Sequence, residues 1–132
     1  MKRTLALLLT SAMLFTAAPA QAGTGVTKSG CIAIDREWLT VTQKLAGVEA
    51  LYKIPEVAAS LQHAATVWSK ASTQVQAKGG TKVATALTTA ATAARTLRTK
   101  LLKSDAKGTI ALSVTMGKAM EKTILPACAA LF

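Results

Sequence analysis

Apolar positions in the first third of the chain recur at alternating steps of three and four residues. That spacing is the signature of one face of an α-helix, because side chains three or four positions apart lie above one another. The pattern predicts a helix from about Cys31 to Lys53. Its main apolar face comprises Cys31, Ile34, Trp38, Val41, Leu45, Val48 and Tyr52.

A second, weaker apolar line lies on the opposite side of this helix, through Ile32, Leu39, Ala46 and Ala50. A helix that is apolar on two sides is either central in its fold or shared with a partner. A homodimer is therefore one open alternative.

A second helix is predicted to begin at Ile54-Pro55-Glu56, because proline cannot continue a helix but suits the first turn of a new one. Lys78-Gly79-Gly80 should end this helix, since glycine commonly follows a helix C-terminus. The apolar face between them consists of Val57, Leu61, Ala64, Trp68, Ala71 and Val75.

A third helix is expected to start with Thr81 as its cap. Its many threonines have poor helix propensity, but the period of the apolar positions favours helix over strand. The predicted apolar face is Val83, Leu87, Ala90, Ala94, Leu97 and Leu101. Residues 104–108 form the next connection.

The fourth helix, from about Thr109 to Leu125, carries two apolar faces that are rotated from one another. One face is Ile110, Val114, Gly117, Met120, Ile124 and Cys128, and the other is Leu112, Met116 and Met120. The pattern leaves open which face is buried, and with it the orientation of Glu121. Pro126 is expected to kink or interrupt the helix, because its ring collides with the Lys122 carbonyl one turn back.

The N-terminus has the pattern of a secretory signal. Lys2 and Arg3 precede an apolar run over 5–15, and Ala20-Gln21-Ala22 is typical of a cleavage site. The run is shorter than the roughly 20 residues of a membrane span. We expect cleavage of residues 1–22, a flexible tail over 23–30, and export of a single domain over 31–132, periplasmic or secreted, without a membrane span.

The two cysteines of the chain are Cys31 and Cys128. In an exported protein they are most simply one disulfide. Four helices of similar length with short connections predict an all-α, up-down-up-down four-helix bundle. Such a bundle places the start of its first helix beside the end of its last, so that the disulfide closes it. In architecture alone, this resembles exported four-helix bundles.

The chain is strongly basic. Its formal net charge is +10, and removing Lys2 and Arg3 with the signal leaves +8. Such a charge favours an anionic or acidic partner, either a protein or an envelope polymer, although it can also serve solubility alone. Aromatic residues do not interleave with the basic ones, which argues against nucleic acid. The candidate contact residues are Arg95, Arg98, Lys100 and Lys103.

Catalytic and metal-binding patterns are missing from the sequence. His63 is the sole histidine, so no histidine pair can bind a metal and no nucleophile with a histidine base can be assembled. We expect His63 to lie on the solvated surface. The sequence predicts a protein without cofactor or enzymatic activity.

Four large side chains allow one alternative function. Trp38, Trp68, Met116 and Met120 either fill the core or line a pocket for a small apolar ligand or haem. The leading hypothesis is a small exported basic helical binding protein of inhibitor, immunity or envelope-accessory type. A carrier of an apolar ligand or haem within the bundle is the alternative.

Overall fold

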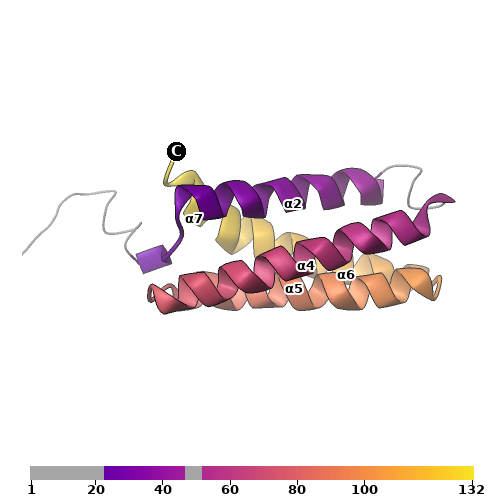
Figure 1. The fold of residues 1–132 in the computed structure, drawn as a ribbon. Coiled ribbons are helices and arrows are strands. Elements are labelled where there is room, and N and C mark those ends of the chain that lie inside the picture. The colour runs from indigo at the N-terminus through magenta and orange to yellow at the C-terminus, as the bar shows by residue number, and fades with distance from the viewer. Residues whose placement is uncertain (1–22, 47–51) are drawn as a thin grey trace, which may run out of the picture.

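The chain folds into an all-α four-helix bundle (Figure 1) in a computed structural model that describes residues 23–46 and 52–132. The elements are α2 (Lys28–Ala46), α4 (Ile54–Ala77), α5 (Thr81–Leu102), α6 (Ala106–Ala119), the π-helical η2 (Met120–Ile124) and α7 (Leu125–Ala129). Helix α4 packs against α2 and α5, and α5 packs against α6. Successive helices run in opposite directions (Figure 1), which confirms the predicted bundle. The predicted signal over 1–22 and the predicted helix positions Val48 and Ala50 lie outside the described residues.

The start of the predicted first helix and the position of Tyr52 need correction. Thr27 caps α2, because its Oγ1 accepts a hydrogen bond from the backbone N–H of Gly30 at 3.1 Å. Residues 28–30 therefore belong to α2 rather than to a tail. Tyr52 is 80% exposed and lies beyond α2, just before α4 at one end of the bundle. Its assignment to the core was wrong, because its side chain lies in solvent at this end of the bundle.

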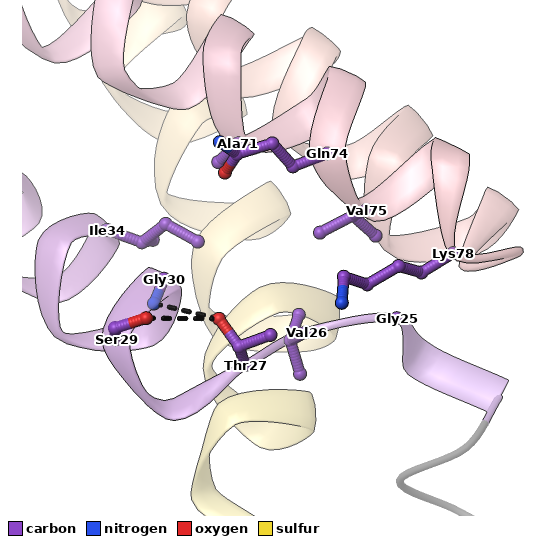
Figure 2. Close-up of a pocket in the computed structure, with 10 residues that line it drawn as sticks. All are labelled: Gly25, Val26, Thr27, Ser29, Gly30, Ile34, Ala71, Gln74, Val75 and Lys78. Carbon is purple, nitrogen blue, oxygen red and sulfur yellow. Dashed lines mark hydrogen bonds between the residues drawn. The ribbon is translucent and has the colours of Figure 1, made fainter.

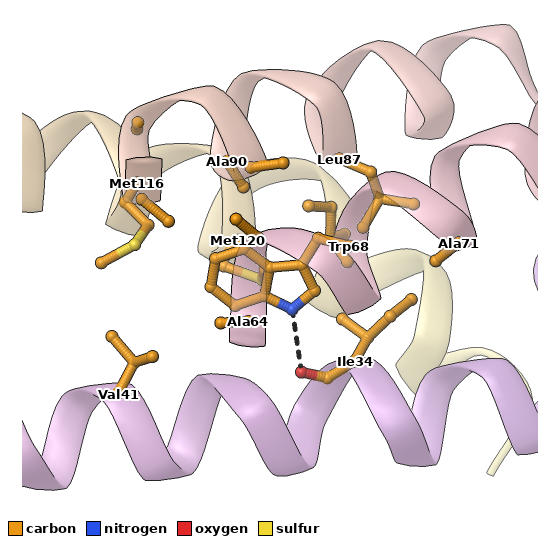
Figure 3. Close-up of a cluster of buried hydrophobic side chains, with 14 of the residues drawn as sticks. Ile34, Val41, Ala64, Trp68, Ala71, Leu87, Ala90, Met116 and Met120 are labelled. Carbon is orange, nitrogen blue, oxygen red and sulfur yellow. Dashed lines mark hydrogen bonds between the residues drawn. The ribbon is translucent and has the colours of Figure 1, made fainter. Parts of the chain in front are cut away.

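The core lies between apolar faces that match the predicted ones on α4 and α5. Every position predicted for those two faces is buried. Figure 3 shows the indole of Trp68 at the centre, between α2, Ala90 of α5 and the two methionines of the fourth helix. Its Nε1–H donates to the Ile34 carbonyl oxygen at 3.3 Å. This bond satisfies the one polar atom of the ring and joins α4 to α2.

The α4–α5 turn is a Schellman motif. Gly79 adopts φ +84°, the Gly79 N–H donates to the Gln76 carbonyl, and the Gly80 N–H donates to the Val75 carbonyl. A Cβ at Gly80 would overlap the carbonyl oxygen of Thr24. The N-terminal cap of α5 is Gly80 and no side chain caps it, so the predicted Thr81 cap was wrong. Thr81 is instead the first residue of the helix.

The fourth helix buries the second of its two predicted faces. Met116 and Met120 are fully buried, whereas Ile110 and Val114 are exposed. Glu121 is exposed as well. Ile124 and Cys128 continue the buried line in steps of four residues. A regular α-helix has about 3.6 residues per turn, so positions that are always four apart would gradually move around the helix and away from the core. The π turn of η2 offsets that rotation, because it accommodates one extra residue.

The π turn ends at Ile124, two residues before Pro126. The regular α-helix is therefore interrupted where the proline predicts it. The Leu125 N–H donates to the Met120 carbonyl five residues back. Beyond it the chain continues as α7, which carries Cys128. Cys31 and Cys128 form a disulfide with their Cα atoms 5.6 Å apart. This confirms the predicted pairing, and the C-terminus lies beside the start of α2 (Figure 1).

Candidate functional site

The four predicted contact residues on α5 are divided between two sides of that helix. Arg95 faces α4, where its Nη2 donates to Ser69 Oγ at 2.8 Å, and Arg98 is half-buried beside α4. Lys100 faces α6, with its Nζ 3.6 Å from Oδ2 of Asp105, the cap of α6. Lys103 is exposed at the end of α5. The structure does not bring these four side chains onto one surface.

A different set of lysines meets in a groove between α5 and the fourth helix. We call it the lysine groove, and its volume is about 400 Å³. Its lining residues are Lys82, Thr85, Ala86, Thr89, Thr115, Lys118, Ala119, Lys122 and Thr123. Each helix contributes residues spaced by three or four, so two antiparallel faces look onto one another. Ala86 and Ala119 are small, which lets the two helices approach closely.

The lysine groove is electrostatically one-sided. It has three ammonium groups and four hydroxyls, with no carboxylate among its lining residues. Within residues 23–46 and 52–132, no ion pair engages Lys82, Lys118 or Lys122. Lys82 is the second residue of α5, and the first-turn amides of a helix also attract anions. The groove can bind negatively charged groups by charge and by hydrogen bonds together.

Sequence reasoning missed this groove for a physical reason. Lys118 and Lys122 lie four residues apart, which places them on one helical face. The sequence offers two alternative apolar faces for the fourth helix, so it does not decide whether the lysine face is directed toward α5 or away from it. The contact of α5 with α6 decides it. The small residues Ala86 and Ala119 were the available signal, because such positions permit close approach of two helices.

His63 is exposed, as expected, but it also has a buried partner. Its side chain is 67% exposed, and its Nδ1 lies 2.7 Å from Oε1 of Glu37, whose side chain is 10% exposed. A carboxylate accepts hydrogen bonds, so Nδ1–H is the donor. The bond joins α4 to α2. Glu37 was not singled out in the sequence, although it lies one turn from Ile34 and Val41 of the buried face.

The predicted apolar pocket is filled by its own side chains. Trp68, Met116 and Met120 are fully buried, and the ring centroids of Trp38 and Trp68 are 6.5 Å apart. Three surface grooves of the bundle, between α2 and α4, between α4 and α5, and between α5 and the fourth helix, are lined by other residues. Binding of an apolar ligand or haem by this cluster stays a prediction.

Figure 2 shows a pocket of about 310 Å³ between the start of α2 and the end of α4. The Thr27 hydroxyl is bonded to the Gly30 N–H and lies 3.4 Å from the Ser29 hydroxyl. Lys78 is the one charged residue in its lining. These hydroxyl bonds lie within the N-terminal segment itself, and with a single lysine in its lining the pocket is a weaker candidate than the lysine groove.

In the described part of the chain, no three or more histidine, cysteine or acidic residues are arranged to hold a metal ion. No helix there is long and apolar enough to cross a membrane. Comparisons with protein-family models, curated proteins and solved structures find no match for this chain.

Proposed function

We propose that this protein is a small exported helical binding protein that contacts an anionic partner through the lysine groove. The observation that carries the proposal is the convergence of Lys82, Lys118 and Lys122 on one groove without a carboxylate in its lining. The net charge of +8 after signal removal attracts anions to the molecule as a whole. The groove gives that attraction a specific location.

The shape of the groove favours a linear polyanion over a flat acidic surface. Its lining runs from Lys82 to Thr89 on α5, which is about 10 Å of helix. Lys82 and Lys122 lie toward one end and Lys118 lies one turn further along. An extended polymer with closely spaced sulfate, phosphate or carboxylate groups can meet all three lysines, and the four threonines add hydrogen-bonding oxygens.

Export is part of this proposal. It rests on the signal pattern over 1–22 and on the disulfide, because disulfides persist in oxidising compartments. The expected partners are therefore acidic polymers or proteins of the cell envelope or the medium. Inhibitor, immunity and envelope-accessory roles all act through such contacts.

The test measures binding of dextran sulfate to the disulfide-bonded chain across a range of salt concentrations. Replacing Lys82, Lys118 and Lys122 by Gln should weaken binding by about tenfold or more and flatten its salt dependence. The matched control replaces Lys70, Lys78 and Lys107, which are exposed and lie outside the lysine groove. It removes the same charge and should weaken binding by less than about threefold.

Equal losses in the two triple variants would refute the assignment, since net charge alone would then explain binding. An unchanged affinity in the groove variant would refute it as well. Circular dichroism of both variants establishes that the bundle remains folded.

Self-association is a second proposal with its own observation. Ile32 and Leu39 are large apolar residues that α2 leaves half exposed, on the second line that the sequence marks. We propose that a homodimer would use this line. Sedimentation velocity of the wild type and of Leu39→Lys tests it, because a dimer at this face should dissociate in the variant.

A further inference from the structure

A second groove lies between α4 and α5, away from the lysine groove. Its volume is about 540 Å³ and its lining residues are Pro55, Ala58, Ala59, Gln62, His63, Thr66, Arg98 and Leu102. The two helices are antiparallel (Figure 1). Going along α5 from Arg98 to Leu102 therefore leads back along α4 from His63 toward Pro55. The groove thus has a polar end and an apolar end.

The polar end contains an oriented histidine. Nδ1–H of His63 is held by the buried carboxylate of Glu37 at 2.7 Å. Among the described residues, no partner engages Nε2. With Nδ1–H held in this way, the ring keeps a fixed orientation at this end of the groove. Glu37 lies behind the ring on α2 and is not part of the groove lining.

Arg98 supplies the charge at the same end. It is half-buried, and in the described part of the chain it has no ion pair. A guanidinium binds a carboxylate through two parallel hydrogen bonds, and partial burial strengthens them. No acidic residue lines the groove. This end is therefore complementary to a small anion.

The apolar end is formed by Pro55, Ala58, Ala59 and Leu102. Leu102 is 48% exposed although it is a large apolar residue. From His63 back to Pro55, the groove follows about 12 Å of helix. An alkyl chain of medium length fits this distance and would cover these residues from water.

We propose that this groove binds an amphipathic carboxylate, specifically a medium-chain fatty acid anion. The carboxylate bonds the guanidinium of Arg98 beside the His63 ring, and the alkyl chain lies over Ala58, Ala59 and Leu102. This site is independent of the proposed polyanion contact, because the two grooves share no residue.

The experiment titrates decanoate into the disulfide-bonded chain by calorimetry, with acetate and decanol as comparison ligands. Decanoate should bind at least tenfold more tightly than either, because only decanoate supplies both the charge and the chain. Since His63 is the sole histidine, its ring resonances give an unambiguous NMR readout. They should shift with decanoate and stay in place with decanol.

Two variants test where the carboxylate and the alkyl chain of decanoate lie in the groove. Arg98→Gln should weaken decanoate binding at least tenfold, and Leu102→Glu should abolish it by putting a carboxylate where the chain lies. Arg95→Gln is the matched control, since it lies one turn away, exposed and outside the groove. It should bind like the wild type, as should the lysine-groove variant.

The proposal is overturned if decanoate fails to bind, or if Arg98→Gln binds it as the wild type does. Equal affinity for acetate and decanoate would show that the groove binds the carboxylate but not the alkyl chain. Equal affinity for decanol and decanoate would show that it binds the alkyl chain without using the charge. Each of these results also overturns the assignment. None of them affects the dextran sulfate test, so the two proposals fail separately.

Discussion

At the scale of single residues, Ser104 has a strained backbone, because it is a non-glycine residue with a positive φ. Ser104 follows α5 with φ +58° and occupies the left-handed position of a Schellman motif. Its N–H donates to the Leu101 carbonyl, as that of Gly79 does to Gln76 after α4. Side chains with a Cβ are strained in this region, by about 1 kcal/mol, whereas glycine is not.

Ser104→Gly should therefore raise the free energy of unfolding by about 0.5 to 1 kcal/mol. The reciprocal variant is Gly79→Ala, at φ +84° in open space. It should lower the same quantity by about 1 kcal/mol through backbone strain alone. Urea denaturation measures both. A destabilised Ser104→Gly protein would contradict the assignment of Ser104 to the left-handed position.

The Glu37–His63 bond yields a prediction of non-additivity. His63→Ala leaves the Glu37 side chain, 10% exposed, without its partner, which should cost about 1 to 2 kcal/mol of stability. Adding Glu37→Leu removes the unpartnered carboxylate, so the double variant should be more stable than His63→Ala alone. Gln62→Ala, exposed on the same helix, is the control and should change little. Additive losses would show that the bond contributes nothing.

At the scale of elements, Asp105 links the end of α5 to the start of α6. Its Oδ1 accepts the Gly108 N–H at 2.9 Å, and its Oδ2 lies 3.6 Å from Lys100 Nζ. The Gly108 hydrogen bond is the main cause that holds the pKa of this carboxyl below its usual value; desolvation opposes it, and the charge and hydrogen bond of Lys100 add smaller lowering effects. The ionised side chain therefore stabilises the folded state.

Because the folded pKa is depressed, this contribution is present above the unfolded pKa and is lost as pH falls through the folded pKa. Asp105→Asn keeps a capping oxygen but has neither charge nor titration. The wild type should exceed it in denaturation midpoint at about pH 7, and the gap should close toward about pH 2.5. A gap that stays constant between these two conditions would contradict the argument.

The elements show what a periodic pattern can and cannot predict. The faces of α4 and α5 were predicted correctly because one regular period runs between clear start and stop signals. The face of the fourth helix was not resolved, since the register changes at a π turn before Pro126. The lysine groove depends on that register. Among the four candidate contact residues, Arg95 bonds to Ser69 of α4 whereas Lys100 lies beside Asp105 at the start of α6, and the periodic pattern of α5 alone does not predict these contacts.

At the scale of the whole molecule, the bundle is not held together equally on all sides. Helix α4 packs against both α2 and α5, and α5 packs against α6. Helix α2 is joined to the fourth helix at the α7 end, where α2 contacts α7 and the disulfide lies. Trp38 also approaches Gly117, since a Cβ there would lie 3.9 Å from the indole. The disulfide therefore holds the start of α2 against α7.

Replacing Cys31 and Cys128 together by Ser should lower the free energy of unfolding by up to about 4 to 5 kcal/mol, because the bond closes a loop of nearly the whole domain. The loss should also be uneven. Hydrogen exchange should accelerate most in α2 and α7, which lose their covalent link, while α4 and α5 keep their mutual packing and exchange more slowly. Uniform acceleration across all helices would instead show that the bundle unfolds as one unit without local opening. Such a result would mean that the packing of α2 on α4, with the Trp68 and Glu37 bonds that join these helices, suffices to hold α2 in place without the disulfide.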